Sequence, residues 1–111
     1  MEREIAHDLI VVIANQGSTD LVMDAAREAG ATGGTVIHAK GTGTDLVRKF
    51  FGVSIASEQE MVFILARSEA KKPIMKAIMA KAGIQSAAQS LVFSLPVGDI
   101  AGLRELEQPE T

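Results

Sequence analysis

The stretch Ala31–Asp45, A-T-G-G-T-V-I-H-A-K-G-T-G-T-D, decides how the chain is organised. Two turns of small residues, Thr32–Thr35 and Gly41–Thr44, flank Val36–Lys40, whose β-branched start and alternating pattern predict a strand. Glycine at both ends of this strand permits positive φ and lets a ligand approach bare amides, and the threonines add hydroxyl groups. The pattern favours either a small-anion or nucleotide site at the strand ends or two purely structural turns.

The composition limits the classes of protein to which the chain can belong. Its 111 residues suit one domain with a single core, and 47% hydrophobic residues with 23% charged residues exclude a disordered chain. The net charge of −3, without a basic stripe, argues against nucleic acid as a partner. The absence of cysteine excludes disulfides and thiolate chemistry. With no signal peptide and no long apolar run, we expect a cytoplasmic protein without direct membrane insertion.

Three more segments are predicted to be strands: His7–Ala14, Glu58–Ala66 and Leu91–Val97. The first is apolar throughout, as in a strand that is buried on both faces. Pro96 places the last of these strands at a sheet edge or makes it end there.

Two segments have the periodicity of amphipathic helices. The first begins at Ser18 or Thr19, either of which can cap it, and ends at Gly30 as the C′ residue. Its expected apolar face consists of Leu21, Val22, Ala25, Ala26 and Ala29. The second helix covers residues 70–82, with Pro73 near its start and Gly83 as its C′ residue. Its expected apolar face consists of Ile74, Ala77, Ile78 and Ala82.

The order strand, helix, strand, strand, helix, strand predicts an α+β fold, the ferredoxin-like βαββαβ sandwich. We expect this domain to span residues 1–106, followed by a polar tail over residues 107–111. Two helices cover only one face of a four-stranded sheet, whereas the first and third strands are apolar on both faces. The second face would expose a large apolar surface, so the pattern predicts a homo-oligomer.

The segment 44–57 has no clear period and is long for a connection between two strands. It contains Phe50 and Phe51, which are half of the aromatic residues of the chain. These two rings either pack against the edge of the domain or contact a partner protein.

The residues that carry catalytic chemistry are few, so we expect a binding protein and not an enzyme. Neither His7 nor His38 has a metal-ligating neighbour at the usual spacing, and no nucleophile elbow, Walker loop or dinucleotide fingerprint is present. Two alternatives stay open. One is a metal-binding trimer of related fold that uses these histidines and Asp45, and the other is an enzyme with a site assembled at a subunit interface.

The sequence resembles the PII signalling proteins over about Leu9–Leu106. Gly30–Val36 is similar to the glycine-x-threonine-glycine-x-threonine-valine segment of that family, and Lys40–Gly43 is similar to its entry into the T-loop. Val92–Val97 resembles the last strand. The resemblance implies a ferredoxin-like homotrimer for signal transduction in nitrogen regulation. It also implies an adenine nucleotide, ATP, ADP or AMP, in the clefts between subunits, and a loop that engages a target protein or transporter.

The resemblance also implies which residues bind the effector. Thr35 matches the threonine that contacts adenine, and Thr32 and Gly33 belong to the same motif. Gly41 and Gly43 match the glycines near the phosphates. Arg104 falls near the second phosphate-binding arginine of the C-terminal region, and Phe50 and Phe51 lie in the partner-contacting loop.

Several positions depart from the family pattern. The glycine-aspartate-glycine-lysine of the B-loop is replaced by about Ala88–Leu91, the first C-terminal arginine falls at about Gly102, and the T-loop glutamine aligns with Asp45. The strand lysine that pairs with 2-oxoglutarate falls at Gln59, the loop is shorter, and the chain has no tyrosine to be uridylylated. These departures predict weaker or altered nucleotide binding without 2-oxoglutarate sensing.

Overall fold

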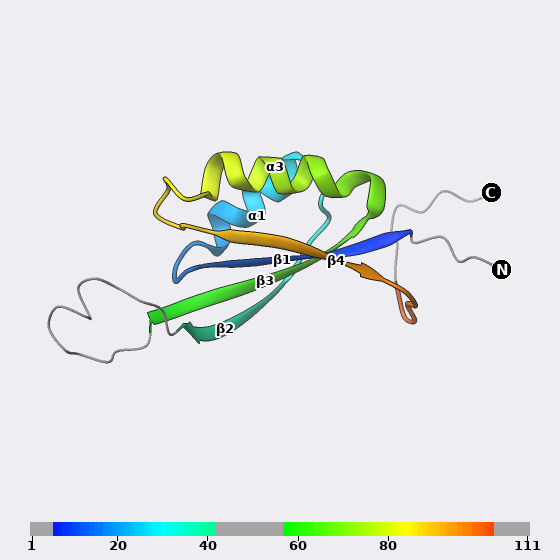
Figure 1. Ribbon diagram of the computed structural model, residues 1–111, viewed down its shortest axis with the longest axis horizontal. Coiled ribbons are helices and arrows are strands. Elements are labelled where there is room, and N and C mark those ends of the chain that lie inside the picture. The colour runs from blue at the N-terminus through cyan, green and yellow to red at the C-terminus, as the bar shows by residue number, and fades with distance from the viewer. Residues whose placement is uncertain (1–5, 42–56, 104–111) are drawn as a thin grey trace, which may run out of the picture.

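The computed structural model describes residues 6–41 and 57–103, which form two layers (Figure 1). One layer is a sheet of four strands, β1 (His7–Asn15), β2 (Thr35–Gly41), β3 (Ser57–Arg67) and β4 (Leu91–Val97). The other layer contains the helices α1 (Thr19–Glu28) and α3 (Lys71–Ala82), and a short 3₁₀ turn, η1 (Ser68–Ala70), precedes α3. The predicted order of strands and helices is confirmed.

The strands lie in the order β2-β3-β1-β4, and every neighbouring pair is antiparallel. This is the arrangement of the ferredoxin-like sandwich, and it confirms the predicted α+β fold class. The strands β1 and β3 are central, as their apolar sequences require. The strand β4 is an edge strand, which explains why Pro96 is tolerated within it.

The core lies between the helices and the face of the sheet that they cover (Figure 1). Alternate residues of β1 and β3 point into it, because side chains along a strand alternate between the two faces. The helices contribute small and branched side chains at the spacing of one helical face. The buried members are Ile10, Val12, Ala14, Val62, Ile64 and Ala66 from the strands, Val22, Met23, Ala25, Ala26, Ile74, Ile78 and Ala82 from the helices, and Ala88.

The buried face of α1 differs from the predicted one by one position. Leu21 is 37% exposed, whereas Met23 is 5% exposed and belongs to the core. The reason is Gly34, which precedes β2: a Cβ atom at this position would lie 3.1 Å from the Met23 sulfur. Because Gly34 has no side chain, there is space for Met23 beside it, and α1 packs in the orientation that places Met23 in this space.

The ends of the two helices differ in conformation. Gly30 adopts φ +114°, as predicted for a C′ residue after α1. Gly83 has φ −80° and ψ −156°, so the expected left-handed C′ conformation is wrong for α3 and the chain leaves this helix extended. The carbonyl group of Ala82 accepts a hydrogen bond from the Ser90 N–H at 3.0 Å, which brings the start of β4 back beneath the helix.

The second face of the sheet is apolar, and neither helix covers it (Figure 1). The register places Val11 between Phe63 and Phe93 on this face, and Leu9 between Leu65 and Leu95. Four large side chains on it remain substantially exposed in a single chain: Ile37 (41%), Leu91 (59%), Phe93 (39%) and Leu95 (50%). We name this surface the open face. No helix within residues 6–41 and 57–103 is long and apolar enough to span a membrane.

Candidate functional site

The predicted effector-binding residues lie at the two ends of β2. Thr32 and Gly33 lie in the connection that precedes the strand, and Thr35 is its first residue, opposite Phe63 on the open face. Gly41 is its last residue. Six residue steps at about 3.3 Å each separate Thr35 from Gly41 by roughly 20 Å. Within one chain, these two residues therefore cannot contact the same part of a small ligand.

Four other predicted site residues, Gly43, Phe50, Phe51 and Arg104, lie outside the described residues. Their roles in effector or partner binding stay predictions. Of the predicted site residues, the structure describes Thr32 and Gly33 in the connection to β2, Thr35 at the start of β2 and Gly41 at its end.

Gly41 lies at the end of the sheet where β1 and β2 finish and β3 begins, which we name the loop end. Gln59 of β3 lies opposite both Asn15 of β1 and Ala39 of β2. The side chain of Gln59 covers Gly41, and a Cβ atom on Gly41 would clash with its amide oxygen. The absence of a side chain at Gly41 leaves room for the Gln59 side chain to lie over the end of β2, and a larger residue would displace that flexible side chain.

Asn15 attaches the segment 83–90 to the loop end. Its backbone N–H donates to the Ala88 carbonyl at 2.9 Å, and its Nδ2 donates to the Ala87 carbonyl at 2.9 Å and to Gln89 Oε1 at 3.4 Å. Ala88 is fully buried, and Gln89 adopts φ +47°, a conformation that residues other than glycine adopt uncommonly. The segment therefore has a defined conformation. Asn15 was not among the predicted site residues.

The side chains that meet at the loop end are mostly neutral amides, those of Asn15, Gln59 and Gln89. Lys40 is close by in sequence, but it lies on the helix-bearing face of the sheet, 4.0 Å from Glu58. Amides supply both hydrogen-bond donors and acceptors without charge. The described part of the loop end can therefore orient a polar ligand, but it offers little positive charge to a polyphosphate.

Glu60 has a structural role that sequence analysis missed. Only 7% exposed, it accepts a hydrogen bond from the Thr19 hydroxyl at 2.5 Å, next to the N-terminus of α1. This hydrogen bond lowers the pKa of Glu60 below its ordinary value, and the backbone N–H groups of Gly17 and Ser18 and the charge of His38 act in the same direction, while burial opposes them. Ser18 is the N-cap residue, as predicted, but its side chain makes no capping hydrogen bond. The sequence did contain a signal of the role of Glu60, because it is an acidic residue within a mostly apolar strand.

The two histidines do not converge. His38 lies opposite Glu60 and His7 lies opposite Arg67, seven positions apart on β3, which corresponds to roughly 23 Å. Among residues 6–41 and 57–103, no group of three histidine, aspartate or glutamate side chains could hold a metal ion. Asp45, the third ligand of the metal-binding alternative, lies outside these residues.

Comparisons with known proteins agree with this fold. A crystal structure of PII from Arabidopsis thaliana bound to citrate superposes with a TM-score of 0.70 at 18% sequence identity, covering 96% of this chain and 89% of that one. No curated protein matches the sequence. The family model for nitrogen regulatory protein P-II matches residues 7–107, which include both helices and all four strands. The chain therefore belongs to the PII family of nitrogen regulatory proteins.

Proposed function

We propose that this protein is a cytoplasmic regulator of nitrogen metabolism that assembles as a trimer and binds an adenine nucleotide in the clefts between its subunits. Through the loop formed by residues 44–57, with Phe50 and Phe51, it acts on a target protein or transporter. The family consists of regulatory signal-transduction proteins and not of enzymes, which supports the general role. The nucleotide, the target and the assembly are our proposal.

The open face supports the assembly. Large apolar side chains from all four strands meet on it, and several of them, including Leu91 and Leu95, are half exposed in one chain. A soluble protein rarely exposes an apolar surface of this extent unless another molecule covers it. Packing of the open faces of several copies against one another removes the surface from water.

The distance between Thr35 and Gly41 is the observation that carries the proposed site. The two residues match the adenine-contacting and phosphate-contacting positions of the family, yet they lie at opposite ends of a seven-residue strand. A nucleotide can contact both only if Thr35 of one subunit lies near Gly41 of a neighbouring subunit. A closed ring of identical subunits provides this arrangement once per interface.

The loop end suggests which nucleotide binds best. Ala88–Leu91 stands in place of the phosphate-binding B-loop, and it contains no lysine or arginine. Each charge-assisted hydrogen bond that is missing costs about 1.5–3 kcal/mol of interaction. We expect AMP or ADP to bind more tightly than ATP, because they place less negative charge beside the neutral amides of Asn15 and Gln89.

The test combines mass measurement with thermal unfolding. After sedimentation has established the oligomeric mass, unfolding is followed with ATP, ADP or AMP, each with and without Mg²⁺. A nucleotide at a hundredfold excess over its dissociation constant should stabilise the protein by about 2.7 kcal/mol. The shift should be smaller in Thr35→Ala and unchanged in the control Ser94→Ala. A monomer would contradict the assembly, and a trimer that responds to none of the nucleotides would contradict the site.

A further inference from the structure

The exposed face of α3 is basic. This helix contains four lysines and no acidic residue. Two of the lysines are engaged within the chain: Lys71 lies 3.5 Å from the buried Asp8, and Lys81 lies 2.7 Å from a carboxylate of α1. Lys72 and Lys76 are exposed. Among residues 6–41 and 57–103, no carboxylate forms an ion pair with these two positive charges, which lie one helical turn apart.

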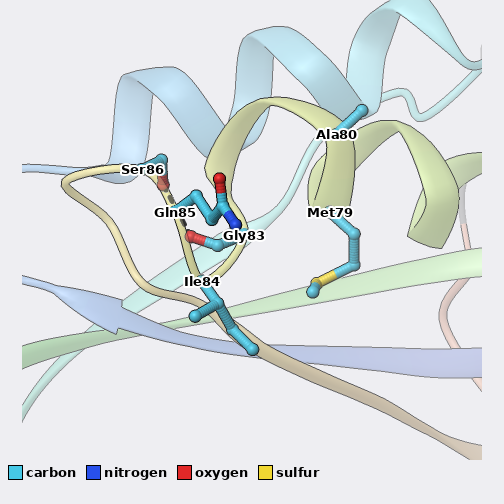
Figure 2. Close-up of a pocket in the computed structure, with 6 residues that line it drawn as sticks. All are labelled: Met79, Ala80, Gly83, Ile84, Gln85 and Ser86. Atoms are coloured by element: carbon cyan, nitrogen blue, oxygen red, sulfur yellow. Dashed lines mark hydrogen bonds between the residues drawn. The ribbon is translucent and has the colours of Figure 1, made fainter.

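An open groove lies at the C-terminal end of the same helix (Figure 2). It has a volume of about 330 Å³ and is lined by Met79, Ala80, Gly83, Ile84, Gln85 and Ser86. Its lining is mixed: Gln85, Ser86 and backbone groups are polar, while the side chains of Met79 (41% accessible) and Ile84 (75% accessible) are apolar. Any side chain at Gly83 would collide with the Met79 carbonyl group, so glycine is required at the bend where the groove forms.

The lysines and the groove form one continuous surface. Residues three and four apart lie on the same side of a helix, so Lys72, Lys76, Met79 and Gly83 follow one another along α3. At 1.5 Å per residue, Lys72 lies only about 10 Å along the axis from Met79. This surface belongs to the helix layer, whereas the open face lies on the other side of the sheet (Figure 1).

We propose that this surface docks an acidic amphipathic segment of a partner protein. An apolar side chain of the segment occupies the groove between Met79 and Ile84, and carboxylates about one and two turns away face Lys76 and Lys72. Charge complementarity selects this partner, because the face provides two unpaired cations and no carboxylate on α3 to repel an anion. Amphipathic helices commonly bind in this way, with apolar anchors in a groove. The docking surface is additional to the nucleotide site and to the loop 44–57.

The test uses designed peptides as defined probes. A fluorescein-labelled helical peptide carries one phenylalanine anchor with glutamates one and two turns from it, and a matched peptide carries lysines in place of the glutamates. Fluorescence anisotropy should show binding of the acidic peptide at least tenfold tighter than that of the basic peptide, and weakening by salt. The double variant Lys72→Glu/Lys76→Glu should reverse the preference. Ile84→Ser should weaken binding of the acidic peptide.

Two control variants are Lys40→Glu and Leu21→Ser, which alter an exposed lysine and an exposed leucine elsewhere. Both should leave peptide binding unchanged. Failure of the acidic peptide to bind, equal binding of both peptides, or an equal effect of Lys40→Glu would overturn the proposal. A lower oligomeric mass of Ile84→Ser would also overturn it, since the groove would then be a contact between copies. Nucleotide-induced stabilisation of Lys72→Glu/Lys76→Glu, which we expect to be unchanged, reports separately on the cleft.

Discussion

Replacement of Glu60 by alanine removes the carboxylate that accepts a hydrogen bond at the N-terminus of α1. This carboxylate is almost completely buried and accepts the Thr19 hydroxyl hydrogen bond at 2.5 Å. A hydrogen bond to a charged group contributes about 1.5–3 kcal/mol, and the loss of an N-terminal cap costs about 0.5–2 kcal/mol. Because the two contributions overlap, we expect Glu60→Ala to lower the free energy of unfolding by about 2–4 kcal/mol.

Urea unfolding, followed by circular dichroism at one protein concentration, measures this loss. A fixed concentration is needed because the stability of an oligomer depends on it. Glu60→Gln keeps an acceptor oxygen but removes the charge, so it should cost less than Glu60→Ala. The Thr19 hydrogen bond lowers the pKa of Glu60 from its ordinary value of 4.5. The stability that the ionised group contributes is therefore fully present above pH 4.5 and is lost as the pH falls through the lowered pKa.

Glu58→Gln is the matched control, since Glu58 lies two residues away on the same strand with an exposed side chain, 4.0 Å from Lys40. Exposed ion pairs of this kind contribute little, so this substitution should change stability by less than about 0.5 kcal/mol. Equal costs of the substitutions at positions 58 and 60 would refute the capping role. A difference between wild type and Glu60→Gln that stays constant through the acidic range would refute the electrostatic part.

Three further predictions concern the loop end, the open face and the packing of α1. Asn15→Ala should lower the free energy of unfolding by about 0.5–1.5 kcal/mol and accelerate amide hydrogen exchange in residues 83–90 but not in α1. Unchanged exchange in residues 83–90 would contradict the role of the hydrogen bond from Asn15 to the Ala87 carbonyl. Phe93→Asp places a charge on the open face, and sedimentation should detect a smaller species than for wild type, whereas an unchanged mass would exclude this face from assembly. Gly34→Ala should lower the stability of the protein in thermal unfolding by about 1–3 kcal/mol, since the added Cβ would lie 3.1 Å from a backbone oxygen of β3. The control Gly33→Ala should cost less, because a Cβ at Gly33 meets open space. Equal costs of the two substitutions would contradict this packing.

Most of the fold follows from local patterns in the sequence. Apolar runs of strand length located all four strands to within two residues at each end, as for Leu91–Val97. The same reasoning predicted a face of the sheet without helices, because strands such as His7–Ala14 are apolar on both sides. These features depend on composition and periodicity, which the sequence displays directly.

The features that the sequence analysis missed depend on residues distant in the chain. Whether Leu21 or Met23 is buried depends on the space beside Gly34, and helical periodicity alone does not contain this information. The cap of α1 comes from Glu60, which is 41 positions beyond Thr19. A search restricted to Ser18 and its neighbours therefore could not find it.

The candidate site shows the same limit. Glycine and threonine content indicated both ends of β2 as a candidate site, but Thr35 and Gly41 lie at opposite ends of an extended strand, so they are far apart within one chain. Asn15 gave no sequence signal of its role, because its partners in the segment 83–90 are more than 70 positions away. A site shared between subunits depends on contacts that one chain does not contain.

A subunit-mixing experiment tests the shared cleft most directly. Thr35→Ala and Gly41→Val are each expected to weaken binding of AMP or ADP, and the nucleotide concentration is chosen so that neither homotrimer alone binds measurably. In a randomly mixed trimer of the two variants, about a quarter of the clefts would combine an intact Thr35 from one subunit with an intact Gly41 from its neighbour. We predict that binding measured by calorimetry returns in this proportion after the variants are unfolded and refolded together. If the mixed trimers form and bind no more nucleotide than either variant alone, both residues do not serve one shared site, and the central claim is wrong.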